Sequence, residues 1–149
     1  MKKIFLYLFA VSLTFSSCSK DDSSSSASKK ITMTIGGQVK SFNTISVTEE
    51  VYDVGTVDEY TDLIVLATND AGTETISISL EKEITGTDAI YYFSYSDGEN
   101  DYYATDSFNT NVTVNNSSKN LKGTFSGILQ GPAMGSTLAV TNGTFDINY

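Results

Sequence analysis

The sequence predicts an all-β domain, an antiparallel β-sandwich or partly open barrel of about nine or ten short strands. Apolar residues alternate with polar ones in many short runs, which is the period of a strand rather than of a helix. Clusters of Gly, Asn, Asp and Ser separate the runs, and such regular turns are typical of sandwiches and barrels. The one helix-like stretch, 81–84, is too short for the crossover helix of a parallel sheet.

The first predicted element is a tight hairpin. Ile31, Met33 and Ile35 alternate with threonines, and a second strand-like run, 38–42, begins directly after Gly36-Gly37. A Gly-Gly pair between two such runs favours a two-residue hairpin, because the turn needs positive φ angles that glycine adopts readily. We therefore predict that the domain begins with two paired strands.

Strand-like runs continue to the end of the chain. The run at 63–68 is continuously apolar and is followed by a turn at 69–72, whereas most other runs alternate. The further runs lie at 76–80, 91–95, 112–114, 121–129, 138–141 and 144–149. The only proline is Pro132, so almost nothing in these segments forbids strand pairing.

Five of the nine tyrosines lie between residues 91 and 103, on both sides of a turn at 97–101. Alternation places Tyr91, Phe93 and Tyr95 on one face, which we predict to be the core face. Aromatic residues favour strands and sandwich cores, so ordinary sheet packing accounts for most of this cluster.

The same hairpin places two tyrosines on its outer face. If the turn is centred on 96–101, Tyr95 pairs with Tyr102, which then joins the core face. Tyr92 and Tyr103 point the other way, among hydroxyl side chains. Two exposed rings in such a setting suit stacking on sugar rings, so these residues are the candidate ligand-binding pair; burial in the sandwich is the ordinary alternative.

The sequence Gly-Thr-Phe occurs at 123–125 and again at 143–145. We expect each glycine to ease the start of a strand and each phenylalanine to enter the core. Phe145, Ile147 and Tyr149 should then share one face. This repeat predicts two similar strands rather than a duplicated domain.

The amino terminus has the order of a secretory signal: a basic start, the apolar run 4–15, two serines and then Cys18. The apolar run is too short to span a bilayer. Residues 15–18, Phe-Ser-Ser-Cys, resemble the lipobox of bacterial lipoproteins, with Phe15 in the place of the usual Leu. The resemblance implies a signal peptide at 1–17, cleavage after Ser17, and a membrane anchor through lipid attached to Cys18.

Residues 18–29 form a short tether between the lipid and the domain, which occupies residues 30–149. Lys20, Asp21 and Asp22 resemble the Lys-Asp-Asp type of export signal of Bacteroidota lipoproteins, which implies the outer membrane and display on the cell surface. A periplasm-facing anchor is the alternative. The serine-rich remainder of the tether has nothing to bury and is predicted to be a flexible spacer.

A second resemblance covers nearly the whole chain after the signal. Its motifs are the Cys-Ser-Lys-Asp-Asp start, the Ile-Thr-Met-Thr-Ile-Gly-Gly hairpin, Val-Thr-Val at 112–114, and the two Gly-Thr-Phe segments with their neighbours. The frame is similar to that of a family of small Bacteroidota lipoproteins defined as a domain of unknown function. The family brings no known activity or site residues to this chain.

Composition excludes several classes of function. The chain has nine Lys, no Arg and no His against 18 acidic residues, a net charge of −9. We expect no nucleic-acid partner, because the charge repels phosphate and the bidentate Arg reader is missing. Without His, and with one Cys, neither an imidazole base nor a His–Cys zinc site can form. We predict no catalytic residue, no metal site and no cofactor.

Two acidic stretches, 97–101 and 53–62, concentrate oxygen ligands of the kind that calcium takes. Neither has the spacing of an EF-hand loop, and we interpret both as solvated turns. Paired carboxylates also hydrolyse glycosides, but with 18 acids some pair is inevitable. A carboxylate-dependent hydrolase is therefore only a remote alternative.

The leading hypothesis from sequence is an outer-membrane, surface-displayed lipoprotein with a non-catalytic binding or structural role and a monomeric β domain. The alternative is a module that binds a neutral glycan through Tyr92 and Tyr103. A polyanionic glycan is not expected, because the net charge would repel it.

Overall fold

The computed structural model describes residues 29–149, so the predicted signal peptide and most of the tether lie outside the described residues. The described chain is all-β, as predicted, with ten strands and no helix. The strands are β1 (Lys30–Ile35), β2 (Gln38–Phe42), β3 (Thr44–Tyr52), β4 (Tyr60–Thr68), β5 (Thr75–Glu81), β6 (Ile90–Ser96), β7 (Asp101–Ala104), β8 (Asn109–Asn116), β9 (Asn120–Gln130) and β10 (Thr137–Asn148). Over these residues, no helix is long and apolar enough to cross a membrane.

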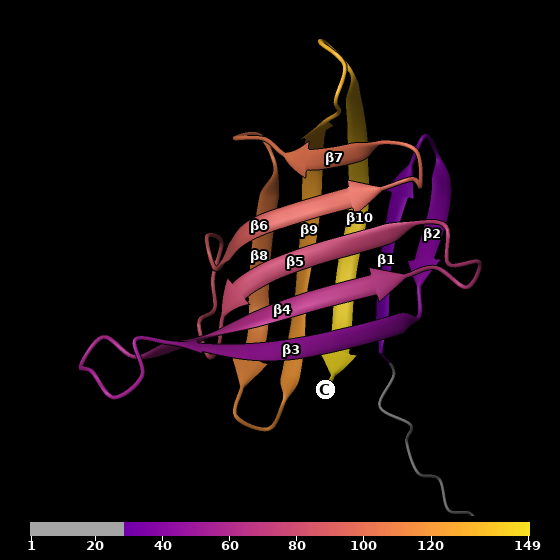
Figure 1. The fold of residues 1–149 in the computed structure, drawn as a ribbon. Coiled ribbons are helices and arrows are strands. Elements are labelled where there is room, and N and C mark those ends of the chain that lie inside the picture. Colours follow the sequence, from indigo (N-terminus) through magenta and orange to yellow (C-terminus); the bar gives the residue numbers. More distant parts are fainter. Residues whose placement is uncertain (1–28) are drawn as a thin grey trace, which may run out of the picture.

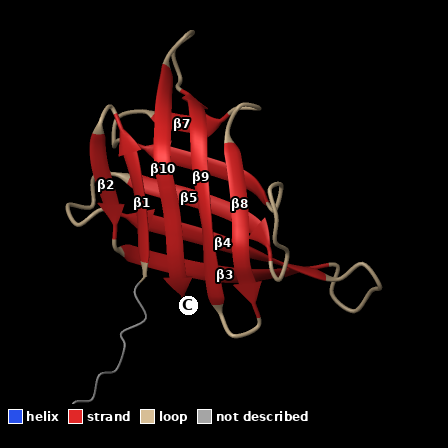
Figure 2. Cartoon of the chain, turned by 180° about the vertical axis from the view of Figure 1, so that it is seen from behind, coloured by secondary structure: helices blue, strands red, loops and turns tan. Residues whose placement is uncertain are grey.

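The strands form two layers that run across one another (Figures 1 and 2). One layer contains β8, β9, β10, β1 and β2 in that order, and the other contains β7, β6, β5, β4 and β3. All paired strands are antiparallel, and the layers are joined where β7 pairs with the end of β9. Strands β2 and β3 end the strand order without pairing with each other, so the curled sheet is a partly open barrel.

The predicted first hairpin is confirmed. Ile35 pairs with Gln38 across the turn, and Gly36 and Gly37 have φ angles of 58° and 78°. Open space surrounds both glycines, so their role is conformational rather than steric.

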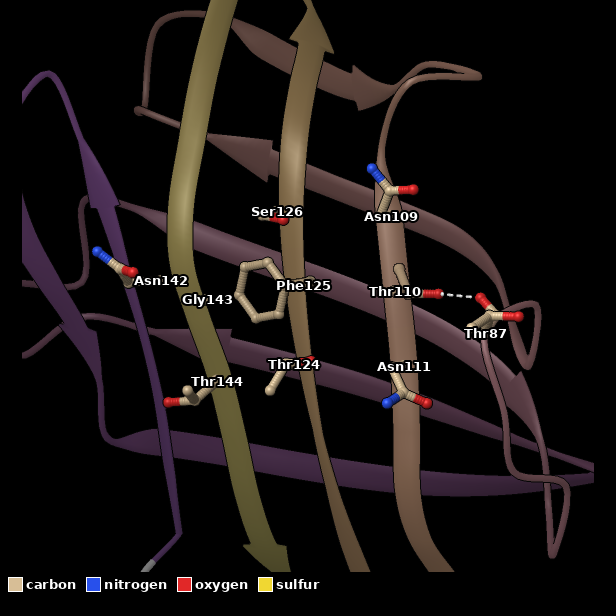
Figure 3. A pocket seen from close by; sticks show the side chains of 10 residues that line it. All are labelled: Thr87, Asn109, Thr110, Asn111, Thr124, Phe125, Ser126, Asn142, Gly143 and Thr144. Atoms are coloured by element: carbon tan, nitrogen blue, oxygen red, sulfur yellow. Dashed lines mark hydrogen bonds between the residues drawn. The ribbon is translucent and has the colours of Figure 1, made fainter.

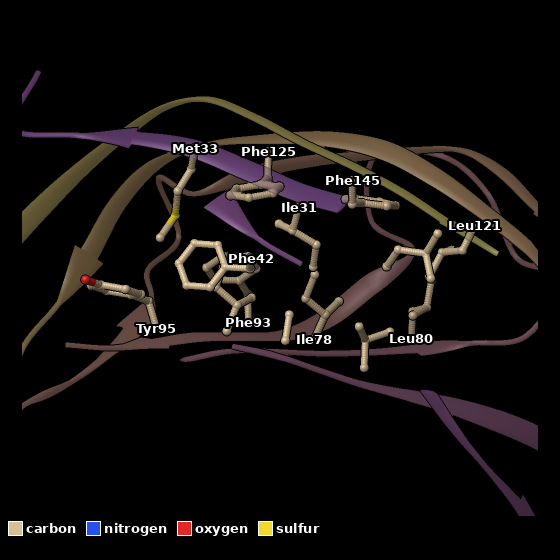
Figure 4. Close-up of a cluster of buried hydrophobic side chains, with 14 of the residues drawn as sticks. Ile31, Met33, Phe42, Ile78, Leu80, Phe93, Tyr95, Leu121, Phe125 and Phe145 are labelled. Carbon is tan, nitrogen blue, oxygen red and sulfur yellow. The ribbon is translucent and has the colours of Figure 1, made fainter. Parts of the chain in front are cut away.

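The hydrophobic core fills the space between the two layers (Figure 4). Ile76, Ile78 and Leu80 of β5 are fully buried, as their alternation predicts. The ring centroid of Phe93, in one layer, lies 4.8 Å from that of Phe125 in the other. Burial of each large apolar side chain contributes about 1.5–3 kcal/mol, which is what holds the layers together.

Two features of the strand pattern differ from the prediction. The runs at 138–141 and 144–149 belong to one strand, β10, because a bulge at Asn142, with a φ angle of 52°, shifts the register without ending the pairing. Strand β3 is absent from the predicted runs because Glu49 and Glu50 interrupt its apolar alternation. It lies at an end of the strand order, where charged side chains are readily solvated.

The Gly-Thr-Phe repeat has a different role from the one expected. Both glycines lie inside strands, and each lies opposite the phenylalanine of the other copy: Gly123 pairs with Phe145, and Gly143 with Phe125. A Cβ atom on either glycine would lie 2.3 Å from a ring atom of that phenylalanine. The glycines therefore make room for the rings, while the phenylalanines enter the core as predicted.

The loop between β5 and β6 is hydrogen-bonded to β8. The Asn115 side-chain amide donates to the carbonyls of Glu81 and Ile84, at 2.8 and 2.9 Å. Gly86 pairs with Val112, and the Thr110 hydroxyl donates to the Thr87 carbonyl at 2.9 Å. These contacts fix the loop whose Thr87 lines a pocket on the outer face of β8, β9 and β10.

Candidate ligand-binding surfaces

The outer face of the β3–β7 layer carries five exposed tyrosines, and we call it the tyrosine face. Its members are Tyr52, Tyr60, Tyr91, Tyr92 and Tyr103. They come from β3, β4, β6 and β7, so the face extends across the whole layer. Tyr91, Tyr92 and Tyr103 lie in the predicted tyrosine hairpin. Tyr52 and Tyr60 lie on the same face because β3 and β4 pair with the rest of the layer.

Tyr92 and Tyr103 lie on the outer face, as predicted. They are 41% and 47% exposed, and their ring centroids are 6.4 Å apart at 62°, an edge-to-face arrangement. Tyr92 lies opposite Ser79, and Tyr103 lies opposite Ser94. The two rings thus form an angled platform beside serine hydroxyls, rather than one flat surface.

The inner side of the same hairpin is partly as predicted. Tyr95 pairs with Tyr102, and both are buried, with ring centroids 6.1 Å apart. The core position predicted for Tyr91 is wrong, because this residue is 60% exposed. A bulge between β5 and β6 shifts the register at Ser79 and Leu80, and Tyr91 is the extra residue.

The centre of the tyrosine face carries no charged side chain. Two successive rows of paired residues cross the layer there, and they contain hydroxyl, aliphatic and aromatic side chains only. The rows are Ser46, Leu66, Ser77, Ser94 and Tyr103, and next to it Thr48, Ile64, Ser79 and Tyr92. Hydrogen-bonding hydroxyls beside apolar and aromatic surface are the groups that recognise an uncharged, hydroxyl-rich molecule.

One end of the tyrosine face is acidic. Asp62 of β4 lies directly between Glu50 of β3 and Glu81 of β5. The Tyr91 hydroxyl donates to Asp62 Oδ2 at 2.6 Å, and the Tyr52 hydroxyl donates to Glu50 Oε2 at 2.7 Å.

These contacts disfavour the phenolate form of both tyrosines. Burial and then the hydrogen bond to the Asp62 carboxylate raise the pKa of Tyr91 well above its usual value. The hydrogen bond to Glu50 raises the pKa of Tyr52 to about 12. Both hydroxyls therefore remain donors over the physiological pH range.

A second surface, the uncharged pocket, lies on the outer face of β8–β10 (Figure 3). Its volume is about 550 Å³, and eight of its ten lining residues are Asn, Ser or Thr. The lining residues are Thr87, Asn109, Thr110, Asn111, Thr124, Phe125, Ser126, Asn142, Gly143 and Thr144. None of these side chains is charged.

Two separate structural features form this pocket, and neither is predicted from the sequence. The bulge at Asn142 displaces β10 from its regular course, and the loop containing Thr87 closes the side next to β8. Because the pocket contains no carboxylate, the two acids that glycoside hydrolysis requires do not converge there.

The two acidic stretches of the sequence lie in different structural settings. The predicted hairpin turn at 97–101 is confirmed, and the Asp97 carboxylate accepts hydrogen bonds from the Asn100 and Glu99 backbone N–H groups at 2.8 and 3.0 Å. In the stretch 53–62, Asp62 is buried in a strand instead of lying in a solvated turn. Within residues 29–149, no three acidic residues come close enough together to hold a metal ion.

The predicted lipid and export residues, Cys18, Lys20, Asp21 and Asp22, lie outside the described residues. Comparison of the chain with protein-family models, with curated proteins and with solved structures finds no match.

Proposed function

We propose that this chain is a lipid-anchored, surface-displayed, non-catalytic domain that binds a neutral saccharide through Tyr92 and Tyr103. The observation that carries the proposal is the uncharged centre of the tyrosine face. Two rows of uncharged side chains cross the layer and end at these two rings, in a chain whose net charge is −9.

The chemistry of the two rings supports a sugar ligand. A tyrosine ring offers a rigid apolar face at low entropic cost, and its hydroxyl is a hydrogen-bonding group. Ser79 and Ser94 add hydroxyls beside the rings, and both are partly exposed. A saccharide needs both kinds of contact, because its C–H groups pack on an aromatic face while its hydroxyls need polar partners.

The experiment is a glycan screen with the purified chain, followed by calorimetric titration of each neutral oligosaccharide that binds. We expect weak binding, in the millimolar range or slightly tighter. Tyr92→Ala and Tyr103→Ala should each reduce it at least about fivefold, because each removes a stacking surface worth roughly 1 kcal/mol. Polyanionic glycans should bind more weakly than neutral ones.

Tyr60→Ala is the matched control, because it removes an exposed tyrosine from the other end of the same face. Thr124→Ala tests the uncharged pocket in the same way. Binding that survives both changes at Tyr92 and Tyr103 but is lost with Thr124→Ala would move the saccharide to the pocket. Failure of every neutral glycan at millimolar concentration would overturn the proposed ligand.

The anchor is tested separately from the ligand. Metabolic labelling with a fatty-acid probe should mark the wild-type chain but not Cys18→Ala, because the Cys18 thiol is the proposed acceptor. Equal label in both chains would remove the lipid anchor from the proposal and leave the saccharide site unaffected.

Surface display depends on the proposed export signal. Protease added to intact cells should digest the domain of the wild-type chain. A variant with alanine at Lys20, Asp21 and Asp22 should be protected and yet remain in the membrane fraction. A protected wild-type chain would place the domain on the periplasmic side.

A further inference from the structure

The acidic end of the tyrosine face presents three carboxylates on three neighbouring strands. Glu50, Asp62 and Glu81 lie directly opposite one another across β3, β4 and β5. Like charges directly opposite one another in a sheet are destabilising. A cation bound at this row would relieve that repulsion.

No lysine supplies that cation among the described residues. The four ion pairs of residues 29–149 join Lys40 to Glu74, Lys82 and Lys119 to Glu49, and Lys122 to Asp146. None of these pairs includes Glu50, Asp62 or Glu81. Within residues 29–149, the negative charge at this end of the tyrosine face thus has no lysine partner.

Asp62 is the centre of the cluster and has an unsatisfied acceptor. It is 8% exposed, and its Oδ2 atom has one partner, the Tyr91 hydroxyl. Its Oδ1 atom is buried and accepts no hydrogen bond. An unsatisfied buried carboxylate oxygen is costly, so a group that donates a hydrogen bond to Oδ1 and carries positive charge would be bound favourably.

Aromatic surface surrounds the same carboxylate. Tyr52 and Tyr60 stack on each other with ring centroids 5.1 Å apart. The Tyr52 hydroxyl donates to Glu50, and the Tyr91 hydroxyl donates to Asp62 on the next strand. Tyrosine faces attract cations through the ring quadrupole. Three rings beside three carboxylates are therefore suited to an organic cation, which has both charge and apolar surface.

A depression adjoins the row at Glu81. Its volume is about 350 Å³, and Tyr60 and Glu81 line it together with Glu59 and Glu83. Thr61 and Lys82 complete the lining, and Lys82 is already paired with Glu49 at 2.8 Å. The depression meets the acidic end of the tyrosine face at Tyr60 and Glu81, and Glu50, Asp62 and Tyr91 do not line it.

The carboxylates and aromatic rings of this site favour an ammonium group over a metal ion. Among the described residues no three acids are close enough to ligate a metal, whereas ammonium needs only hydrogen-bond acceptors and a cation–π surface. A quaternary ammonium has no N–H to donate to the vacant Oδ1 atom. We propose that Asp62, with Glu50 and the rings of Tyr60 and Tyr91, forms a binding site for a primary alkylammonium group.

Tyr91 borders this site. Its side chain is 60% exposed, and the residue belongs to the bulge, so it is not held by regular strand pairing on its β5 side. The Tyr91 hydroxyl donates to Asp62 Oδ2, which leaves Asp62 Oδ1 and the Glu50 carboxylate as the acceptors for the ammonium group.

This site is independent of the proposed saccharide site. The saccharide proposal rests on Tyr92, Tyr103 and uncharged rows, whereas the ammonium site rests on Asp62 and Glu50. Either ligand can fail to bind without consequence for the other.

The test is a titration of the full chain, purified in detergent with ¹³C-labelled tyrosine, with n-butylammonium chloride. Ring signals of Tyr60 and Tyr91, assigned from Tyr→Phe variants, should shift and saturate at millimolar ligand, whereas those of Tyr92 and Tyr103 should not. Added salt should weaken the response, since it screens the charges. Asp62→Asn should weaken binding at least about tenfold, and Glu50→Gln should weaken it by a smaller factor.

Three controls separate this site from weaker explanations. n-Butanol has the same chain without the charge, tetramethylammonium has the charge without N–H donors, and Asp146→Asn removes a half-exposed carboxylate, paired with Lys122, from the other layer. n-Butanol and tetramethylammonium should bind more weakly than n-butylammonium, and Asp146→Asn should bind it like the wild type.

Several outcomes would overturn the site: an equal response to n-butanol, undiminished binding by Asp62→Asn and Glu50→Gln, or saturation by Ca²⁺ but not by the ammonium ion. Circular dichroism shows whether Asp62→Asn remains folded. If that variant unfolds, Glu50→Gln decides the question, because Glu50 is exposed and its amide is isosteric.

Discussion

At the scale of single residues, the Gly-Thr-Phe repeat shows how a strand interior accommodates glycine. Glycine weakens a strand, because it adds backbone entropy and has no side chain to pack. Here the phenylalanine of the paired strand covers each glycine: Phe145 lies over Gly123, and Phe125 lies over Gly143. The two copies of the motif are therefore complementary halves of one packing arrangement.

This arrangement predicts a large cost for Gly143→Ala. The added Cβ would lie 2.3 Å from Phe125 Cδ2 and 2.4 Å from the Phe125 carbonyl oxygen, so a core ring would have to move. We expect a loss of about 2–3 kcal/mol in the free energy of unfolding, measured by urea denaturation.

Gly36→Ala is the comparison. Gly36 has a φ angle of 58° and nothing within 4 Å of an added Cβ, so this change costs only backbone strain, about 1 kcal/mol. A cost for Gly143→Ala no larger than that of Gly36→Ala would show that the ring packing does not require glycine.

At the scale of elements, the Asp97 side chain stabilises the turn of the β6–β7 hairpin. The Asp97 carboxylate accepts two backbone N–H groups of the turn, and the Tyr102 hydroxyl donates to it at 3.3 Å. The backbone hydrogen bonds from Asn100 and Glu99 lower the pKa of Asp97 below its usual value. This hairpin carries both Tyr92 and Tyr103, so its turn matters for the proposed saccharide site.

The turn predicts a pH-dependent contribution to stability. Because the pKa of Asp97 is lower in the folded chain, its ionised form stabilises the fold at pH values above the unfolded pKa, near 3.9. That stabilisation is lost as the pH falls through the folded pKa. Asp97→Ala should reduce the free energy of unfolding by about 1 kcal/mol at pH 7, and the difference from wild type should narrow below about pH 4.

Denaturant titrations of both chains from pH 7 to pH 2.5 measure this difference. Asp97→Asn should retain most of the stability at neutral pH, because the amide oxygen still accepts the turn hydrogen bonds. If the difference in free energy of unfolding between wild type and Asp97→Ala stays constant over this range, the ionised carboxylate does not stabilise the turn.

At the scale of the whole molecule, the two layers bury one continuous core. The rings of Phe93, Phe108 and Phe125 pack at tilted angles and join β6 to β9 through the segment that follows β7. Gly127 allows that segment to approach, because a Cβ there would lie 2.5 Å from the Ser107 carbonyl oxygen. The hydrogen bond from the Thr105 hydroxyl to the Ile128 carbonyl, 2.9 Å, holds the same corner.

A core of this kind predicts that the domain folds without the proposed lipid. The fragment 30–149 should be a monomer with a strand-dominated circular dichroism spectrum and a single cooperative urea transition, because its core is formed from its own strands. Size-exclusion chromatography and denaturation with and without EDTA measure both properties. Helical spectra, or unfolding caused by the chelator, would contradict the prediction.

The sequence by itself determined the strand class, the first hairpin, and the outward direction of Tyr92 and Tyr103. These features depend on alternation and on turns between neighbouring residues, so local pattern is enough to establish them. The proposed lipid and export motifs also rest on the sequence alone, because they are short linear segments.

Only the tertiary structure decided the rest of both surfaces. The exposure of Tyr91 depends on a bulge between β5 and β6, and its contact with Asp62 joins residues 29 positions apart. The uncharged pocket depends on a second bulge, at Asn142, and on the loop containing Thr87, which is hydrogen-bonded to β8. Neither bulge changes the sequence pattern enough to be recognised, because an extra residue in a strand moves side chains between faces without altering composition.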